Sequence, residues 1–247
     1  MNRLTGKVAV VTGGSRGIGR ATAKLFAEEG AKVAVVSRTR ANIDAVVAEI
    51  EAAGGTAIGV VCDVSDGDQI KVAIEQVVVA FGGIDILVNN AFDPSAPNSS
   101  ILDLSVEQLQ RNFEMGPISY LRLMQAAHPH LKASGEGRII NFGSMAGVMG
   151  LAGYGPYNMA KEAVRALTRT AAREWAADKI TVNNLLPLAL TWGEDAGVPE
   201  PTNPLGRYGD PEHDVAPVVL FLASKDSQYM TGYSLTPDGG SLIDSAR

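Results

Sequence analysis

The stretch KVAVVTGGSRGIG, residues 7–19, is a short run of β-branched residues that passes directly into a glycine-rich turn. Residues 7–12 predict a buried strand, and residues 18–29 predict an amphipathic helix that ends at Gly30. Glycines at 13, 17 and 19 permit the unusual backbone angles of a tight turn and let a phosphate approach bare backbone. The helix that follows presents free N–H groups to such a phosphate. This context favours a nucleotide-cofactor turn over an ordinary strand–helix connection.

The same alternation of short apolar runs and longer segments of helical period continues outward from this turn. We expect further strands at residues 32–37, 56–62, 84–89, 138–142, 181–186 and 233–236. We expect helices at 41–53, from the caps at 63–66 to Phe81, and at 105–133, 157–177 and 211–223. Continuous apolar strands separated by helices indicate a parallel sheet covered on both faces. The prediction is an α/β, doubly wound parallel sheet (a Rossmann fold) of about seven strands, as a single domain over residues 1–247.

Composition and charge exclude several other classes of protein. The chain has 247 residues, of which 46% are hydrophobic and 19% charged, so it is neither disordered nor a disulfide scaffold. Its net charge of −6 argues against a nucleic-acid or anionic-membrane surface as the main activity. Cys62 is the only cysteine, and the three histidines lack the spacing of metal ligands, so we expect no metal. Without a signal-like or membrane-spanning apolar run, we expect a cytoplasmic protein.

Motifs downstream of the glycine turn fall in a recognisable order along almost the whole chain. They are Asp63-Val64, Asn89-Asn90-Ala91, Ser144, Tyr157 with Lys161, Asn183 with Pro187, Thr231-Gly232 and Asp238-Gly239-Gly240. With TGGSRGIG at residues 12–19, this order resembles the short-chain dehydrogenase/reductase family. Within it, the chain is similar to 3-oxoacyl-carrier-protein reductases and secondary alcohol dehydrogenases. The resemblance is specific for the family and weak for the substrate.

The end of the second predicted strand bears on the choice of cofactor. A carboxylate there would bind the ribose hydroxyls of NAD and repel a 2′-phosphate, but this chain has Ser37 followed by Arg38. Arg38 and Arg16 provide guanidinium groups suited to a phosphate, which favours NADP(H) over NAD(H). The resemblance extends the expected cofactor-binding set to Gly13, Ser15, Arg16, Gly17, Ile18, Gly19, Ser37, Arg38, Asp63, Val64, Asn90, Ala91, Tyr157, Lys161, Pro187 and Thr191.

Three residues form the expected catalytic set. Tyr157 and Lys161 are four residues apart and share a helix face, and Ser144 follows the strand at 138–142. A nearby ammonium would lower the pKa of the phenol, which makes Tyr157 a candidate general acid/base. Ser144 would hydrogen-bond the substrate oxygen. We therefore expect an NADP(H)-dependent oxidoreductase that interconverts a small-molecule ketone and a secondary alcohol.

Three positions depart from the family pattern near the expected nicotinamide. Phe92 and Leu188 stand where the family has glycine, and Gly116 stands where it has a helix asparagine. Asn112 lies one helical turn from Gly116 and is a weak candidate to replace that asparagine. Two alternatives stay open: an enoyl reductase that uses Tyr154, or a catalytically weak NADP(H)-binding sensor or structural homologue.

The remaining expectations concern the substrate pocket and assembly. Candidate pocket residues are Phe92, Met145, Met149, Tyr154 and Trp192, although the two methionines fit plain packing equally well. Residues 191–208 could form a short substrate lid. The family resemblance implies a homotetramer built through the long helices at 105–133 and 157–177.

Overall fold

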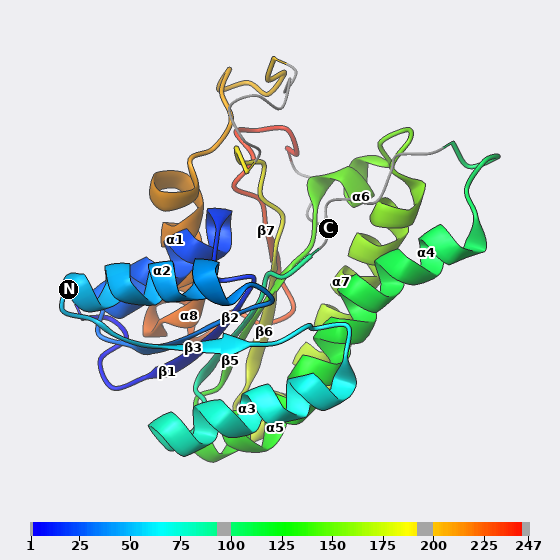
Figure 1. Ribbon diagram of the computed structural model, residues 1–247. Helices are drawn as coiled ribbons and strands as arrows, with labels where there is room; N and C mark the ends of the chain where they lie inside the picture. Colours follow the sequence, from blue (N-terminus) through cyan, green and yellow to red (C-terminus); the bar gives the residue numbers. More distant parts are fainter. Residues whose placement is uncertain (1, 93–99, 192–199, 244–247) are drawn as a thin grey trace.

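In the described part of the chain, seven strands, most of them rich in β-branched residues, pair in parallel at the centre of the molecule (Figure 1). The computed structural model describes residues 2–92, 100–191 and 200–243. The strands are β1 Val8–Thr12, β2 Lys32–Ser37, β3 Thr56–Val61, β4 Ile86–Asn89, β5 Arg138–Phe142, β6 Thr181–Leu185 and β7 Ser234–Leu235. Their order across the sheet is β3-β2-β1-β4-β5-β6-β7. Each predicted strand is present, with ends that differ by up to two residues.

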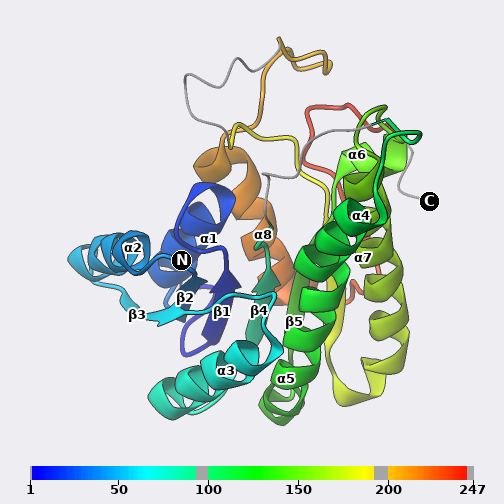
Figure 2. The same ribbon diagram turned by 45° about the vertical axis from the view of Figure 1, so that its right-hand side comes forward.

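Helices cover both faces of this sheet (Figures 1 and 2). One layer contains α1 Gly17–Glu28, α2 Arg40–Ala52 and α8 Ala216–Ala223, and the other contains α3 Gly67–Phe81, α5 Ser119–Ser134 and α7 Gly155–Glu174. Successive strand residues point to opposite faces, so Val11 packs in the first layer and Val10 in the second. Burial on both faces explains the absence of polar alternation in the strands. The predicted doubly wound single domain is confirmed.

The parallel arrangement collects the loops of the site at one edge. All seven strands run in the same direction, so the segments after β1, β4, β5 and β6 leave from the same carboxyl edge. Strands β2 and β3 are added on one side of β1, and β4 to β7 are added on the other side. The direction in which the sheet grows along the chain therefore reverses beside β1. In open α/β sheets, ligands bind outside the carboxyl ends of the strands at such a reversal.

The largest difference from the predicted elements is in the helix expected at 105–133. It is divided into α4 Val106–Phe113, a π-helical turn η1 Glu114–Ile118, and α5. Pro117 lies inside this turn, where its missing N–H would interrupt an α-helix. A second π-helical turn, η3 Pro211–Val215, precedes α8, and a short helix α6 Met145–Met149 follows β5.

The other helical pieces are single 3₁₀ turns, η2 Ala176–Asp178 and η4 Lys225–Ser227. Among the described residues, we find no helix with the length and apolar character needed to cross a bilayer.

Candidate active site

The glycine turn after β1 is a cradle that only bare backbone fits. Gly13 and Gly17 have positive φ values of +63° and +51°, which side-chain-bearing residues rarely adopt. A Cβ atom at Gly13 would lie 2.7 Å from Nδ2 of Asn90, and one at Gly19 would overlap the carbonyl oxygen of Gly13. The predicted role of these glycines in a close backbone approach therefore has a steric basis.

The first turn of α1 opens toward this cradle. Its N-cap is the exposed Arg16, and no side chain in the described part of the chain caps the helix. Uncapped N–H groups at a helix N-terminus carry partial positive charge and suit a phosphate. The residues present therefore fit the pyrophosphate of a dinucleotide. Ile18 is buried in the first layer and anchors the start of the helix.

The ends of β1 and β2 meet next to the cradle. Oγ of Ser15 donates a hydrogen bond to Oγ of Ser37 at 2.9 Å, which joins the glycine turn to the end of β2. Arg38 follows directly and is exposed. Arg40, two residues later, pairs with Asp44 at 3.3 Å. Arg16, Ser37 and Arg38 thus lie on segments that border the same edge of the sheet.

A second set of hydrogen bonds ties the end of β4 to the glycine turn. Nδ2 of Asn90 donates to the carbonyl oxygen of Thr12 at 2.9 Å. The N–H groups of Asn90 and Ala91 donate to the hydroxyl of Thr12 at 3.0 and 3.2 Å. The side chain of Asn90 therefore braces the turn, so the segment with Ala91 is held in a fixed position beside the cradle.

Asp63 and Val64 form the connection after β3. The carboxylate of Asp63 accepts hydrogen bonds from the N–H and hydroxyl of Ser65 at 3.0 and 2.7 Å. Val64 is buried in the second layer. These contacts fix the backbone of the connection at the carboxyl end of β3.

Ser144, Tyr157 and Lys161 come together where β5 ends against α7. Ser144 is the N-cap of α6, and its Oγ accepts the N–H of Ala146 at 3.1 Å. Tyr157 and Lys161 lie one turn apart on α7, and Nζ of Lys161 donates to the carbonyl oxygen of Phe142 at 2.8 Å. The side chain of Ser144 also lies close enough to Tyr157 to oppose the rise in the pKa of its phenol. The three predicted catalytic residues are therefore neighbours.

Burial drives both titratable groups of this set toward their neutral forms. It raises the pKa of Tyr157, and a hydrogen bond from Ser144, which favours the phenolate, opposes that rise. Burial also lowers the pKa of Lys161 to about 7. The site without a bound cofactor therefore holds a protonated phenol next to an amine that titrates near neutrality.

Aromatic rings surround this set. The ring of Phe92 packs edge-on against Tyr157 with centroids 5.1 Å apart, and Tyr154 lies 6.4 Å from the same ring. Tyr154 is partly exposed at the N-cap of α7. On α6, Met145 is half-buried and Met149 is half-exposed. Four of the five predicted pocket residues thus lie on segments at this edge, and the fifth, Trp192, lies outside the described residues.

The other two departures from the family pattern are also placed. Gly116 is buried in η1, where an added Cβ would lie 3.6 Å from the ring of Phe92. Asn112 is buried in α4, and its Nδ2 donates within its own helix to the carbonyl oxygen of Gln108 at 3.0 Å. Leu188 pairs through its backbone with Pro237 and Gly209.

The segment after β6 reaches the glycine turn. It passes through the half-buried Pro187 to Thr191, whose side chain is the nearest neighbour of a Cβ placed on Gly17, at 3.8 Å. The expected lid at residues 191–208 lies partly outside the described residues. In its described part, Nδ2 of Asn203 donates to the carbonyl oxygen of Arg207 at 2.8 Å.

Sequence reasoning named Asn89 only as part of a motif and missed three other polar residues beneath the site. Nδ2 of Asn89 donates to Oδ1 of Asn141 at 2.8 Å, and Nδ2 of Asn141 donates to the hydroxyl of Thr168 at 2.9 Å. Tyr120 of α5 is fully buried next to Lys161. For Asn89 and Asn141, the available signal was an asparagine inside an otherwise apolar strand. Tyr120 gave no signal, because a tyrosine in an amphipathic helix is unremarkable.

Comparisons with known proteins agree with this arrangement. A family model described as enoyl-(acyl carrier protein) reductase matches residues 13–241. A 2,5-dichloro-2,5-cyclohexadiene-1,4-diol dehydrogenase of Sphingobium indicum is 39% identical over 97% of both chains. A 3-oxoacyl-(acyl-carrier-protein) reductase of Thermotoga maritima is 36% identical over 98% of this chain and all of its own. A dehydrogenase/reductase of Sinorhizobium meliloti has a crystal structure with a TM-score of 0.89 and 37% identity, covering 97% of this chain and 96% of its own.

The chain belongs to the short-chain dehydrogenase/reductase family. The predicted family is therefore confirmed, and the chain is an NAD(P)-dependent oxidoreductase of that family. The members named above differ in the substrates that their names give, so membership alone does not define the substrate of this chain.

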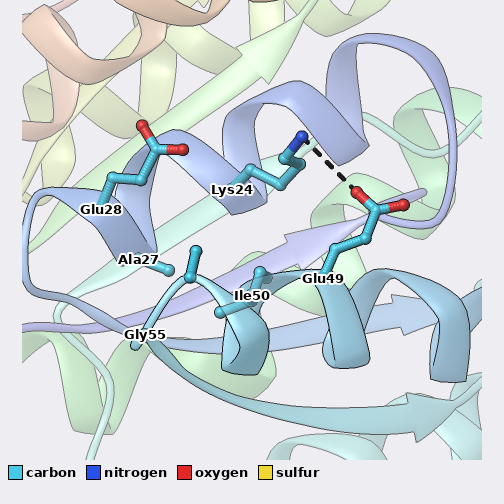
Figure 3. Close-up of a pocket in the computed structure, with 7 residues that line it drawn as sticks. Lys24, Ala27, Glu28, Glu49, Ile50 and Gly55 are labelled. Atoms are coloured by element: carbon cyan, nitrogen blue, oxygen red, sulfur yellow. Dashed lines mark ion pairs between the residues drawn. The ribbon is translucent and has the colours of Figure 1, made fainter.

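A cavity elsewhere in this short-chain dehydrogenase/reductase is separate from the site (Figure 3). It lies between α1 and α2 and is lined by Lys24, Ala27, Glu28, Glu49, Ile50, Ala53 and Gly55. Nζ of Lys24 and the carboxylate of Glu49 approach to 3.5 Å across it. Within the described ranges, we find no cluster of three or more metal-ligating side chains.

Proposed function

We propose that this chain is an NADP(H)-dependent enzyme that interconverts a ketone and a secondary alcohol. One observation carries the proposal: Ser144, Tyr157 and Lys161 converge at the carboxyl edge of the sheet, next to the glycine cradle. The bound cofactor supplies or accepts a hydride in this chemistry. The chain itself has to bind and orient the reactants and move one proton.

Tyr157 is the proposed group that moves the proton. In reduction, its hydroxyl donates a proton to the carbonyl oxygen as that oxygen gains negative charge. Burial raises the pKa of Tyr157, so the phenol is protonated and ready to act as the acid. Ser144 donates a hydrogen bond to the same oxygen and stabilises its developing charge.

Oxidation requires the opposite protonation state. Tyr157 then accepts the alcohol proton as a phenolate, which nearby positive charge stabilises. The ammonium of Lys161 is the cationic group that α7 places one turn away, with Nζ 5.7 Å from the centre of the Tyr157 ring. Through the family resemblance, Lys161 also holds the nicotinamide ribose.

The preference for NADP(H) is supported by the chemistry at the end of β2. Ser15 and Ser37 are hydrogen-bonded there, and no carboxylate occupies the position that would repel a 2′-phosphate. Arg38 follows Ser37, and Arg16 is the N-cap residue of α1, so two guanidinium groups lie on the segments that would flank the adenosine ribose. The backbone of Gly13 to Gly19 would hold the pyrophosphate, and Asp63 with Val64 would border the adenine.

The nicotinamide end of the proposed site is built from the other strand ends. Asn90, Ala91, Pro187 and Thr191 would contact the nicotinamide and its ribose, as the family resemblance implies. Apolar side chains near Ser144 favour a largely apolar substrate, with Phe92, Met145, Met149 and Tyr154 as candidate contacts. The lid at residues 191–208 and the cytoplasmic location are proposals that rest on the sequence, and the homotetramer is a proposal that rests on the family resemblance.

Consumption of NADPH with a panel of ketones and enones tests the proposed function. Wild type, Tyr157→Phe and Tyr154→Phe are compared on the same panel. We expect Tyr157→Phe to lose about 10²- to 10⁴-fold in turnover of ketones, because the proton donor is removed, while Tyr154→Phe stays within a few-fold.

The other outcomes identify the alternatives. Loss confined to Tyr154→Phe, with enones as substrates, would establish an enoyl reductase. Tight NADPH binding with no turnover over a broad panel would establish a sensor or a structural homologue.

A further inference from the structure

The ammonium of Lys161 lies among three aromatic rings. Nζ is 4.4 Å from the ring centre of Phe92, 5.5 Å from that of Tyr120 and 5.7 Å from that of Tyr157. The rings come from three segments, namely the loop after β4, α5 and α7. We call Phe92, Tyr120 and Tyr157 the aromatic cage of Lys161. Only 3% of Lys161 is exposed, so the cage separates the amine from water.

A buried ammonium needs compensation, and the cage is its main source. Nζ donates one hydrogen bond, to the carbonyl oxygen of Phe142, and no acidic side chain in the described ranges forms an ion pair with it. Burial alone lowers the pKa of Lys161 to about 7. The negative faces of aromatic rings attract a cation and favour the charged form.

Among the residues that the structure describes, the groups around the cage add no other charge next to Lys161. The titratable groups facing it are the phenols of Tyr120 from α5 and Tyr157 from α7, and Tyr154 faces Tyr157. In η1, Glu114 is ion-paired with Arg122, and on α7 Glu162 is ion-paired with Arg165. Both of these carboxylates therefore have arginine partners. The groups that stabilise the ammonium of Lys161 directly are the three rings and the carbonyl oxygen of Phe142.

The position of the Phe92 ring depends on a glycine. A Cβ atom at Gly116 would lie 3.6 Å from Cε2 of Phe92 and 3.6 Å from Cβ of Ala160. A longer side chain at 116 would extend into the space that the ring occupies. Gly116 thus leaves room for the ring that comes nearest to Lys161, and the two unusual residues form a complementary pair.

We propose that Phe92 and Tyr120 are positioning residues that hold Lys161 as an ammonium inside a dry aromatic cage, where its charge acts on Tyr157. This inference rests on the proposed function for its catalytic consequence, whereas the cage itself can be tested without turnover. Phe92 contributes the nearest ring, so its removal has the larger effect.

The direction of the effect follows from the charge. Without the ring of Phe92, the ammonium of Lys161 is less stable relative to the neutral amine, so the pKa of Lys161 falls. A cation–π contact contributes about 0.5–2 kcal/mol, and one pKa unit corresponds to about 1.4 kcal/mol, so the expected shift is roughly 0.4–1.4 units. With less positive charge beside it, the phenolate of Tyr157 is less stable, so the rise of alcohol oxidation with pH, which follows ionisation of Tyr157, moves to higher pH.

The first measurement uses the cofactor-free protein. Lysine side chains labelled with ¹³C and ¹⁵N are titrated by NMR, and the signal of Lys161 is assigned with Lys161→Met. We expect Phe92→Leu and Tyr120→Leu to lower the pKa of Lys161 by about 0.4–1.4 units. Phe92→Tyr and Tyr120→Phe keep a ring and are the matched controls, with the wild-type titration expected.

The second measurement is the pH profile of kcat/KM for alcohol oxidation by the same variants, each checked for a cooperative thermal transition. The proposal is supported if the rise of kcat/KM with pH moves to higher pH in the two leucine variants and stays in place in the two control variants. The proposal is overturned if Phe92→Leu leaves the titration of Lys161 unchanged, or if Phe92→Tyr shifts it equally. If Phe92→Leu does not fold, the titration of Lys161 is compared in Tyr120→Leu and Tyr120→Phe. An unchanged titration in Tyr120→Leu, or an equal shift in Tyr120→Phe, then overturns the proposal. Failure of the proposed function appears separately, as turnover that survives in Tyr157→Phe.

Discussion

At the scale of single residues, burial shifts the pKa values of Tyr157 and Lys161 away from their usual ranges. Burial raises the pKa of the phenol and lowers that of the amine, and both changes favour neutral groups. A neutral phenol is the form that donates a proton in reduction. Positive charge from an oxidised nicotinamide would favour the phenolate needed for the reverse reaction, so the state of the cofactor and the state of Tyr157 are coupled electrostatically.

Arg38 carries a prediction about cofactor choice. Arg38→Asp replaces a phosphate-binding guanidinium by a carboxylate that repels a 2′-phosphate and accepts bonds from ribose hydroxyls. Hydrogen bonds to charged groups contribute about 1.5–3 kcal/mol, so the ratio of NADPH to NADH affinity should fall by roughly 10- to 100-fold. Fluorescence titration with each cofactor measures the two dissociation constants.

Arg40 offers a matched control for that variant. Arg40→Asp makes the same change of charge two residues away, but Arg40 is directed to Asp44 and to the carbonyl oxygen of Gly59. We expect its affinity ratio to change much less. An unaltered ratio in Arg38→Asp, or an equal drop in Arg40→Asp, would contradict the assignment.

At the scale of elements, a buried polar network fixes the strand ends that carry the site. Asn89, Asn141 and Thr168 connect β4 to β5 and β5 to α7 through two hydrogen bonds. Each of these residues is at most 1% exposed. Buried amides need specific partners, so the network defines one alignment of β4, β5 and α7. Asn90, Ser144 and Lys161 are all close in sequence to its members or on the same helix.

Asn141→Leu removes the centre of this network. The amide of Asn89 then loses its acceptor and Thr168 loses a donor, and each unsatisfied buried group costs about 1–3 kcal/mol. We expect the free energy of unfolding to fall by about 2–4 kcal/mol, measured by urea denaturation. Asn42→Leu on the exposed face of α2 is the control and should stay within about 0.5 kcal/mol. A change of similar size in both variants would refute the role of the network.

The elements also show how far sequence patterns reach. Runs such as residues 8–12 and 32–37 were predictable because strands buried on both faces must be continuously apolar. The π-helical turn at Glu114–Ile118 was not, because the amphipathic period runs on through it and only Pro117 marks the interruption. Helix α6 is five residues long, too short for a period to be recognised.

The candidate site was predictable to a similar degree. Glycines in a turn and an i, i+4 tyrosine–lysine pair are visible as spacing, so the cradle and the pair at 157 and 161 could be anticipated. The cage around Lys161 could not be anticipated. It depends on how closely the rings of Phe92, after β4, and Tyr120, in α5, approach Nζ of Lys161. The same holds for the bracing role of Asn90, which depends on the approach of two strand ends.

At the scale of the whole molecule, one edge of the sheet gathers residues from nearly the full length of the chain. The turn after β1, the end of β2, the segment after β4, Ser144 and the start of α7 all border it. The same strands that place these residues also form the two core layers. A ligand that binds this edge contacts segments on both sides of the sheet reversal, so binding and global stability are linked.

Thermal unfolding with each cofactor makes that linkage measurable. A ligand at 100 times its dissociation constant raises the free energy of unfolding by about 2.7 kcal/mol, which for a chain of this size corresponds to roughly 5–10 °C in Tm. NADPH should therefore raise Tm by several degrees more than NADH at the same concentration. In Arg38→Asp that order should reverse or disappear. Equal shifts from the two cofactors in the wild type would contradict the NADP(H) preference, and the absence of any shift at saturating NADPH would show that the edge with the glycine cradle does not bind the dinucleotide.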